Sequence, residues 1–209
     1  MTAKDTIQQG KAVLGIELGS TRIKAVLIDG DNAPIAQGSH TWENQLENGL
    51  WTYSIKSIWE GVQDCYATLR KDVMDQYGIE LENLAAIGVS AMMHGYMAFN
   101  KNQEILVPFR TWRNTNTGKA AARLSELFNF NIPLRWSISH LYECIIDGES
   151  HVKDIDYLAT LDAYIHWQLT GERVTGIGDA AGMPPIAPDT EDADARGATS
   201  LEAHVAPSG

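Results

Sequence analysis

The chain has 209 residues, 44% hydrophobic and 21% charged, which is an ordinary globular composition with room for one large domain or two small ones. A formal net charge of −11 argues against nucleic acid or an anionic membrane surface as a partner, because both require a basic patch. Residues 1–10 do not resemble a signal peptide, no stretch has the roughly 18 apolar residues of a membrane span, and Cys65 and Cys144 lack metal-like spacing. We therefore expect a cytoplasmic protein with two reduced, structural thiols.

Three strands are predicted near the N-terminus. Val13–Glu17 and Ile23–Asp29 are apolar segments joined by a tight turn, and Gly30-Asp31-Asn32 marks a second turn before a strand over Ile35–His40. This order predicts an antiparallel meander.

A long helix and a buried strand are predicted to follow the meander. Ser57-Ile58-Trp59-Glu60 has the form of a capping box, and Tyr77-Gly78 marks the helix end. The apolar residues between them recur at helical spacing: Trp59, Val62, Tyr66, Leu69 and Val73. Leu84–Ser90 is nearly continuously apolar, which is typical of a central parallel strand covered on both faces. The order β-β-β-α-β predicts an α/β fold with a mixed sheet and a crossover helix.

The second half is predicted to be mostly helical. Helices are expected over Thr117–Phe128, Trp136–Ile146 and Leu158–Leu169, the last closed by Thr170-Gly171. From 187 to 209 the sequence is rich in Ala, Asp, Pro and Gly without apolar periodicity, which predicts a disordered tail.

The turn after the first strand is a candidate phosphate site. Gly19, Ser20 and Thr21 offer backbone amides and hydroxyls, and Lys24 adds a positive charge. Glu17 would repel a bare phosphate unless a divalent cation lay between them, and Mg²⁺ binds through carboxylates, water and phosphates. The alternative is an ordinary hairpin with a glutamate at its edge.

A second candidate segment is Val89–Phe99, at the carboxyl end of the predicted buried strand, where open α/β sheets bind ligands. There His94 could hydrogen-bond a sugar hydroxyl, and Gly95 would let a ligand approach the backbone. The alternative is a structural histidine.

A third segment, Thr111–Gly118, groups Trp112 with Arg113, Asn114 and Asn116. An indole beside amides and a guanidinium suits a polyol, which is apolar on one side and hydrogen-bonding on the other. Asn and Thr before a helix could instead only cap it.

The fourth segment, Leu169–Met183, places Asp179 in a loop rich in Gly and Ala. Small neighbours leave room for a substrate whose hydroxyl proton this carboxylate could accept. The alternative is a loop aspartate in an Asx-turn.

Taken in this order, the four segments resemble the N-terminal domain of the FGGY family of carbohydrate kinases, which belongs to the actin/hexokinase/Hsp70-like ATPase superfamily. The resemblance covers about Val13 to Pro185. It implies a ribonuclease-H-like mixed sheet, an FGGY-type sugar-binding domain over 11–186 after a polar extension over 1–10, and a C-terminal nucleotide-binding domain that this sequence does not show.

The resemblance also assigns roles to residues. Gly19, Ser20, Thr21 and Lys24 would face the phosphates of ATP, and Glu17, where the family usually has Asp, would act with Mg²⁺. Met93, His94, Gly95, Trp112, Arg113 and Asn114 would bind the sugar, and Asp179 would be the catalytic base. Departures from the family pattern are Met92 for Gln, Asn114 for Asp, Asn116 for Arg and Ala181 for Ser.

The implied activity is MgATP-dependent phosphorylation of a hydroxyl on a pentulose or related polyol. Glu17 and Asp179 are then expected to share a cleft, and the 209-residue chain is expected to have negligible activity and to form homo-oligomers. Two alternatives remain: a non-catalytic sugar-binding or regulatory module derived from such a kinase, and an actin- or Hsp70-like ATPase scaffold with a protein partner.

Overall fold

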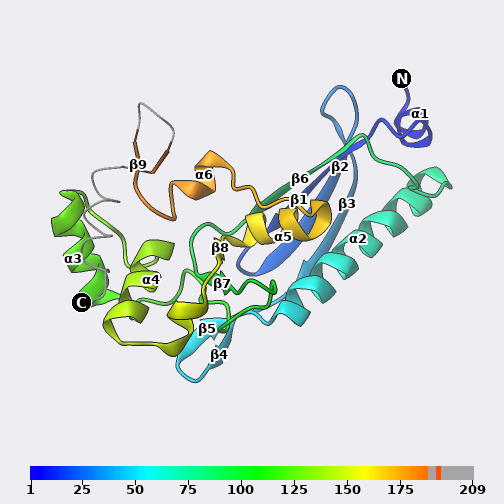
Figure 1. Cartoon of the computed structure of the whole chain (residues 1–209). Coiled ribbons are helices and arrows are strands. Elements are labelled where there is room, and N and C mark those ends of the chain that lie inside the picture. The colour runs from blue at the N-terminus through cyan, green and yellow to red at the C-terminus, as the bar shows by residue number, and fades with distance from the viewer. Residues whose placement is uncertain (188–191, 194–209) are drawn as a thin grey trace. The chain divides into compact units, whose positions relative to one another are not determined.

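A computed structural model describes residues 1–187 and 192–193 (Figure 1). The chain forms two compact units. The first unit comprises Met1–Gln45 and Tyr53–Met92. The second comprises Leu46–Thr52 and the chain from Met93 onward. The domain predicted over 11–186 is thus shared between two units, and each is described by itself.

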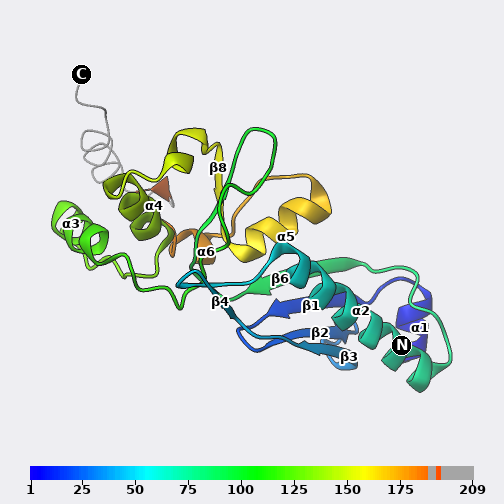
Figure 2. The same ribbon diagram turned by 90° about the horizontal axis from the view of Figure 1, so that it is seen from below.

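The first unit is built on a four-stranded mixed sheet (Figure 2). Its strands are β1 (Val13–Leu18), β2 (Arg22–Ile28), β3 (Pro34–Thr41) and β6 (Ala86–Ala91), arranged in the order β3-β2-β1-β6. The first three form the predicted antiparallel meander, and β6 pairs with β1 in parallel. The mixed sheet predicted from the sequence is therefore confirmed.

Helix α2 (Ile55–Tyr77) is the predicted crossover and packs against β3 and β2. The approach is close enough to require a glycine, because a Cβ atom on Gly38 would lie 2.2 Å from the carbonyl oxygen of Cys65. On the same face of the sheet, β1 contributes the buried side chains Leu14, Ile16 and Leu18 to the core.

Both ends of α2 are capped, but its start differs from the prediction. The cap is Ser54, whose hydroxyl accepts a hydrogen bond from the amide of Ser57, so the predicted capping box at Ser57–Glu60 is wrong. Gly78 ends the helix with φ of 64°, as its sequence predicts. The predicted polar extension over 1–10 contains a short helix, α1 (Ala3–Gln8).

Strand β6 is not covered on both faces as predicted. It is an edge strand in the order β3-β2-β1-β6, and the Ile87 side chain is 49% exposed. Its parallel pairing with β1 is confirmed, but its nearly continuous apolar sequence lies partly open to solvent.

The second unit combines short strands with helices. In chain order its elements are β4 (Gln45–Glu47), β5 (Leu50–Thr52), β7 (Met97–Phe99), α3 (Gly118–Phe128), α4 (Ser137–Ile146), the 3₁₀ helix η1 (Ser150–Asp154), β8 (Tyr157–Ala159), α5 (Leu161–Thr170), α6 (Ile177–Ala180), β9 (Ile186–Ala187) and β10 (Asp192–Ala193). Strand β7 pairs with β8, β4 with β5, and β9 with β10, so three small ladders tie this unit together.

Two packed clusters hold the helices of the second unit. Helices α3 and α4 share a core of Ala120, Leu124, Ile132, Ile138 and Tyr142. Near β7 and β8, Phe99 stacks on Tyr164 with ring centroids 5.5 Å apart and meets the edge of Trp167 at 5.2 Å.

The predicted helix over Leu158–Leu169 is only partly correct. Tyr157–Ala159 forms β8, and helix α5 begins at Leu161, because these three residues pair with β7. Most of the tail predicted over 187–209 lies outside the described residues. None of the helices in the described part of the chain combines the length and hydropathy of a membrane span.

Candidate functional site

In the first unit, the turn from Gly19 to Thr21 is held by its backbone. The amide of Gly19 donates to the carbonyl oxygen of Arg22 at 3.0 Å, and its own carbonyl accepts from Nε1 of Trp42 at 2.7 Å. The hydroxyl of Tyr53 donates to the carbonyl of Ser20 at 2.5 Å. Because Trp42 and Tyr53 stack with centroids 4.1 Å apart, one aromatic pair fixes two carbonyls of the turn.

This geometry leaves fewer backbone donors for a phosphate than the sequence predicts. The Gly19 amide is already used within the turn, whereas the amides of Ser20 and Thr21 have no acceptor among the described residues. Glu17 faces Lys24 across the β1–β2 ladder, with the ammonium 3.5 Å from the carboxylate and both side chains 55% exposed. Such an exposed pair is weak, so either charge remains available to a ligand.

In the second unit, His94 and Gly95 have a strained backbone. Their φ angles are 72° and 113°, and a Cβ atom on Gly95 would lie 2.8 Å from the carbonyl oxygen of Arg110. The carbonyl of Gly95 accepts from the Ser137 hydroxyl at 2.6 Å, and its amide donates to the carbonyl of Arg135 at 3.3 Å. A positive φ at a histidine is uncommon, and here tertiary hydrogen bonds stabilise it.

The loop that contains Asp179 packs against His94. A Cβ atom on Gly182 would lie 2.6 Å from Nδ1 of His94, so only glycine allows this approach. Burial lowers the pKa of His94, which favours the neutral imidazole, able both to donate and to accept a hydrogen bond. The Trp136 indole lies near, with ring centroids 6.5 Å apart.

Asp179 itself lies on α6 and forms a carboxyl pair with Asp162 on α5. Burial, together with a hydrogen bond and charge repulsion from Asp162, raises the pKa of Asp179 to about 7. The Thr160 hydroxyl donates to Asp162 and keeps this second carboxylate in place. A carboxyl group that titrates near neutral pH can accept a proton from a hydroxyl and release it again.

The tryptophan-led segment differs from its prediction. Asn114 is buried, and its amide group is occupied by the backbone of Trp51 (Oδ1 accepts at 2.9 Å, Nδ2 donates at 2.7 Å) and by the carbonyl of Thr111. It therefore holds β5 in place, which favours a structural role. The helix-cap alternative is wrong, because Thr117 makes no cap bond and its hydroxyl donates to the carbonyl of Leu134.

The neighbouring side chains of that segment remain accessible. The Arg113 guanidinium lies 3.7 Å above the Trp51 ring, and the Arg135 guanidinium lies 6.0 Å from the Trp112 ring. Met93 is 43% exposed. Sugar contacts by Met93, Trp112 and Arg113 stay predictions.

The predicted site residues divide between the two units. Glu17, Gly19, Ser20, Thr21 and Lys24 belong to the first unit. Met93, His94, Gly95, Trp112, Arg113, Asn114 and Asp179 belong to the second. Within the second unit the structure brings His94 together with the Asp179 loop, which are 85 residues apart in the sequence (94 to 179).

Several residues of the site were not predicted. Asp162 lies in the first turn of α5, where an acidic residue is an ordinary feature of a helix start. The sequence therefore gives no sign that it pairs with Asp179. Trp42, Trp51 and Tyr53 had no periodic signal. Cys144, to which the sequence assigns only a structural role, also has polar neighbours: Glu149, His151 and Arg110 surround it.

The fold described above is that of a sugar-kinase N-terminal domain, as the comparison with protein families shows. The chain belongs to the FGGY family of carbohydrate kinases, because the model of that family's N-terminal domain matches residues 12–142. The match includes β1, β2, β3, α2 and β6, together with His94, Gly95 and Trp112.

Among proteins of known function, the chain is similar to xylulose kinase of Bacillus subtilis (strain 168), with 24% identity over 187 residues. It is also 24% identical over 184 residues to glycerol kinase of Trichodesmium erythraeum (strain IMS101). It covers 36% of each relative, so it spans a little over a third of their length. The crystal structure of xylulose kinase from Rhodospirillum rubrum matches with a TM-score of 0.78 and 17% identity, over 91% of this chain and 41% of that one. This likeness confirms the predicted fold class.

Proposed function

We propose that the chain is the sugar-binding part of an ATP-dependent carbohydrate kinase that phosphorylates a hydroxyl group of a pentulose or related polyol in the cytoplasm. The observation that carries this proposal is the half-buried carboxyl pair of Asp179 on α6 and Asp162 on α5, because the segment that follows Asp179 packs against His94 at Gly182. Family membership supports the reaction class, and the similarity to xylulose and glycerol kinases supports a small polyol as substrate.

In this proposal Asp179 accepts the proton of the sugar hydroxyl as its oxygen attacks phosphorus. A pKa of about 7 suits that role, because the group is substantially deprotonated at neutral pH yet still basic. Neutral His94 hydrogen-bonds the sugar, and the partly exposed ring of Trp112 or the exposed Arg113 guanidinium contacts it from the neighbouring segment. Phosphoryl transfer requires mainly positioning and charge stabilisation, which such contacts provide.

The first unit offers groups that fit ATP and Mg²⁺. The amides of Ser20 and Thr21, which have no acceptor among the described residues, can donate to phosphate oxygens. Lys24 can neutralise phosphate charge, and Glu17 supplies an oxygen ligand of the kind that magnesium prefers. When bound, the cation would reduce the repulsion between Glu17 and the phosphates.

One observation favours a second candidate, a non-catalytic sugar-binding module. Two elements expected to contact ligand are satisfied internally: the Gly19 amide donates to Arg22, and Asn114 is held by the backbone. A module of this kind would bind the sugar through His94 and Trp112 without needing the phosphate turn.

The test is a coupled assay of ADP release with D-xylulose and glycerol, on the 209-residue chain and on the longest natural protein that contains it. We expect turnover in the longer protein, and Asp179→Asn should lower kcat by about 10²–10⁴-fold with little change in sugar affinity. Asp154→Asn, which alters an exposed carboxylate on η1, is the control. Sugar binding in calorimetry without ATP binding or turnover in any length would instead support the non-catalytic module. Light scattering on the same samples tests whether the chain forms homo-oligomers.

A further inference from the structure

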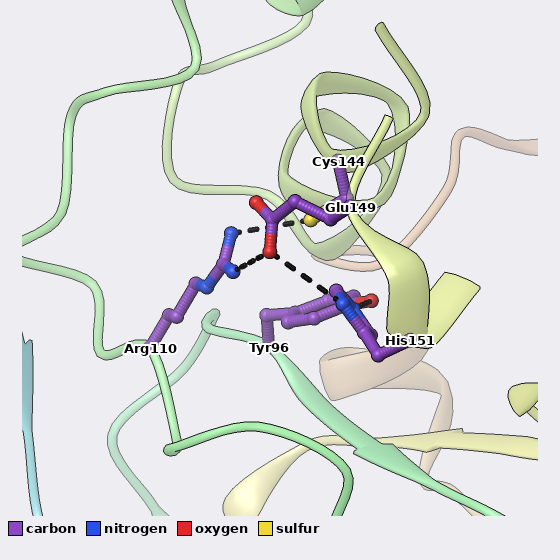
Figure 3. Close-up of polar contacts among 5 residues, drawn as sticks. All are labelled: Tyr96, Arg110, Cys144, Glu149 and His151. Carbon is purple, nitrogen blue, oxygen red and sulfur yellow. Dashed lines mark hydrogen bonds and ion pairs between the residues drawn. The ribbon is translucent and has the colours of Figure 1, made fainter. Parts of the chain in front are cut away.

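A buried group of polar side chains lies in the second unit, in addition to the residues assigned to sugar binding (Figure 3). It contains Tyr96, Arg110, Cys144, Glu149 and His151. The side chains of Tyr96, Arg110, Cys144 and His151 are at most 8% exposed, and Glu149 is 34% exposed and gives the cluster an opening to solvent. The proposed kinase reaction uses none of them.

Three members of the cluster carry metal-ligand atoms that converge. The sulfur of Cys144, a carboxylate oxygen of Glu149 and a ring nitrogen of His151 all lie within 4.8 Å of one another. Nδ1 of His151 is 3.5 Å from Oε2 of Glu149. Nitrogen and oxygen ligands bound about 2.0–2.1 Å from one tetrahedral ion are about 3.3 Å apart, so this pair is already at the required spacing.

The backbone explains why these three residues meet. They come from one eight-residue segment, Cys144–His151, at the end of α4 and the start of η1. Gly148 has φ of 67°, and the amide of Glu149 donates to the carbonyl of Cys144 at 2.9 Å, which turns the chain back over the cysteine. Because the ligands are local, a small movement of one turn would bring the sulfur within bonding distance of the same ion.

The imidazole is oriented as in metal sites. Nε2 of His151 lies 2.8 Å from the Tyr96 hydroxyl, and Nδ1 faces Glu149. If Nε2 carries the proton and donates it to Tyr96, Nδ1 presents its lone pair to the centre of the cluster. Metal-bound histidines usually donate their second ring nitrogen to a protein group in this way.

Arg110 supplies the positive charge that the cluster requires. Its Nη2 donates to Oε2 of Glu149 at 2.6 Å, and its Nη1 donates to the sulfur of Cys144 at 3.1 Å. Figure 3 shows the guanidinium directed at both ligands. A metal ion and Arg110 would therefore compete for the same two atoms.

We propose that Cys144, Glu149 and His151 form a binding site for a zinc-class divalent cation, which enters by displacing Arg110 from Glu149 and Cys144. The ligands would be Sγ of Cys144, the Glu149 carboxylate and Nδ1 of His151, with solvent in the fourth position, and the thiol proton would be released to water. Sulfur, nitrogen and oxygen donors together favour zinc or cadmium over magnesium. Because the thiol must lose its proton to bind the ion, the affinity should increase with pH.

Cadmium is the probe for the first experiment, because a cadmium–thiolate bond gives a charge-transfer band in the ultraviolet. We expect one equivalent of Cd²⁺ to produce this band in the chelator-treated chain, and Zn²⁺ but not excess Mg²⁺ to remove it. Cys144→Ser should abolish the band. Cys65→Ser, which changes the other buried free cysteine, is the matched control and should retain it. Circular dichroism verifies that each variant is folded.

Two further variants separate this site from adventitious thiol binding. Arg110→Met should tighten Cd²⁺ binding at least tenfold, because the competing guanidinium is gone. Tyr96→Phe should weaken it about 10-fold or more, because the orienting partner of His151 is lost. The proposal is overturned by the absence of a band in the original chain, by a band in Cys144→Ser, or by unchanged affinity in both Arg110→Met and Tyr96→Phe.

Discussion

The carboxyl pair of Asp162 and Asp179 makes a specific prediction about how stability depends on pH. Asp179 has a pKa of about 7 in the folded chain and an ordinary value of 3.8 when unfolded. A raised carboxyl pKa stabilises the folded state fully below the unfolded value, and this contribution disappears as the pH rises through 7. Replacing Asp162 with Asn removes the repulsion and the shared hydrogen bond while keeping the burial of Asp179.

The size of the effect follows from the shift. A change from 3.8 to about 7 corresponds to about 4 kcal/mol at most, since each pKa unit is about 1.4 kcal/mol. Burial is the largest cause and persists in the variant, and solvent screens a half-buried pair, so the part due to Asp162 is about 1–2 kcal/mol. The free energy of unfolding of Asp162→Asn, taken relative to that of the original chain, should therefore rise by about 1–2 kcal/mol as the pH is raised from 5 to 8.

The assay is urea unfolding of both chains at pH 5, 6, 7 and 8, read by circular dichroism. Only the difference between the chains is diagnostic, because His94, His140 and His151 have lowered pKa values and add stability as the pH rises. These contributions cancel in the difference. Asp154→Asn, which changes an exposed carboxylate on η1, is the matched control. If the difference between Asp162→Asn and the original chain did not change with pH, the carboxyl pair would have no energetic coupling and the assignment of Asp179 would fail.

Three other substitutions have expected outcomes. Gly38→Ala should lower the unfolding free energy by about 1–3 kcal/mol in a urea titration, because its Cβ atom would overlap the backbone of α2. Gly88→Ala is the control and should be neutral or slightly stabilising, because the space around Gly88 is open. Gly182→Ala should weaken sugar binding measured by calorimetry, because the new methyl group would displace His94. Asn114→Ala should lower the melting temperature by several degrees, because the part-buried amide of Trp51 in β5 loses its acceptor, although the Trp51 carbonyl keeps the Thr111 amide as donor. An unchanged melting temperature with lost sugar affinity would instead indicate direct contact.

Much of the first unit could be predicted because its signals are local. Strands β1, β2 and β3 were located to within one residue at either end, since alternating burial and turn residues mark them directly. The start of α2 was misplaced because Ser54 and Ser57 both suit a cap, and only the structure shows that Ser57 is the donor. The edge position of β6 depends on what pairs with it, which its own sequence does not contain.

The candidate site was harder to predict because its contacts are long-range. The sequence identified His94 and Asp179 as separate motifs, but their meeting through Gly182 depends on tertiary packing. Strand β8 was missed because three residues are too few to show a period of two, and they form a strand only by pairing with β7. Cys144 could have been recognised as clustered, since Glu149 and His151 follow within seven residues in the sequence.

The carboxylate of Glu17 beside the turn can be explained without a metal ion. Lys24 lies opposite it in the β1–β2 ladder at 3.5 Å, so the carboxylate is already balanced within the chain. Because both groups are about half exposed, their attraction is worth at most about 1 kcal/mol, and phosphate with Mg²⁺ could exchange for it at little cost. The pair is therefore compatible with a kinase and with a plain hairpin. A plain hairpin also leaves the amides of its central turn residues to solvent, so only a ligand can tell the two apart: added MgATP should protect the amides of Ser20 and Thr21 from hydrogen exchange in a kinase and leave them unprotected in a plain hairpin.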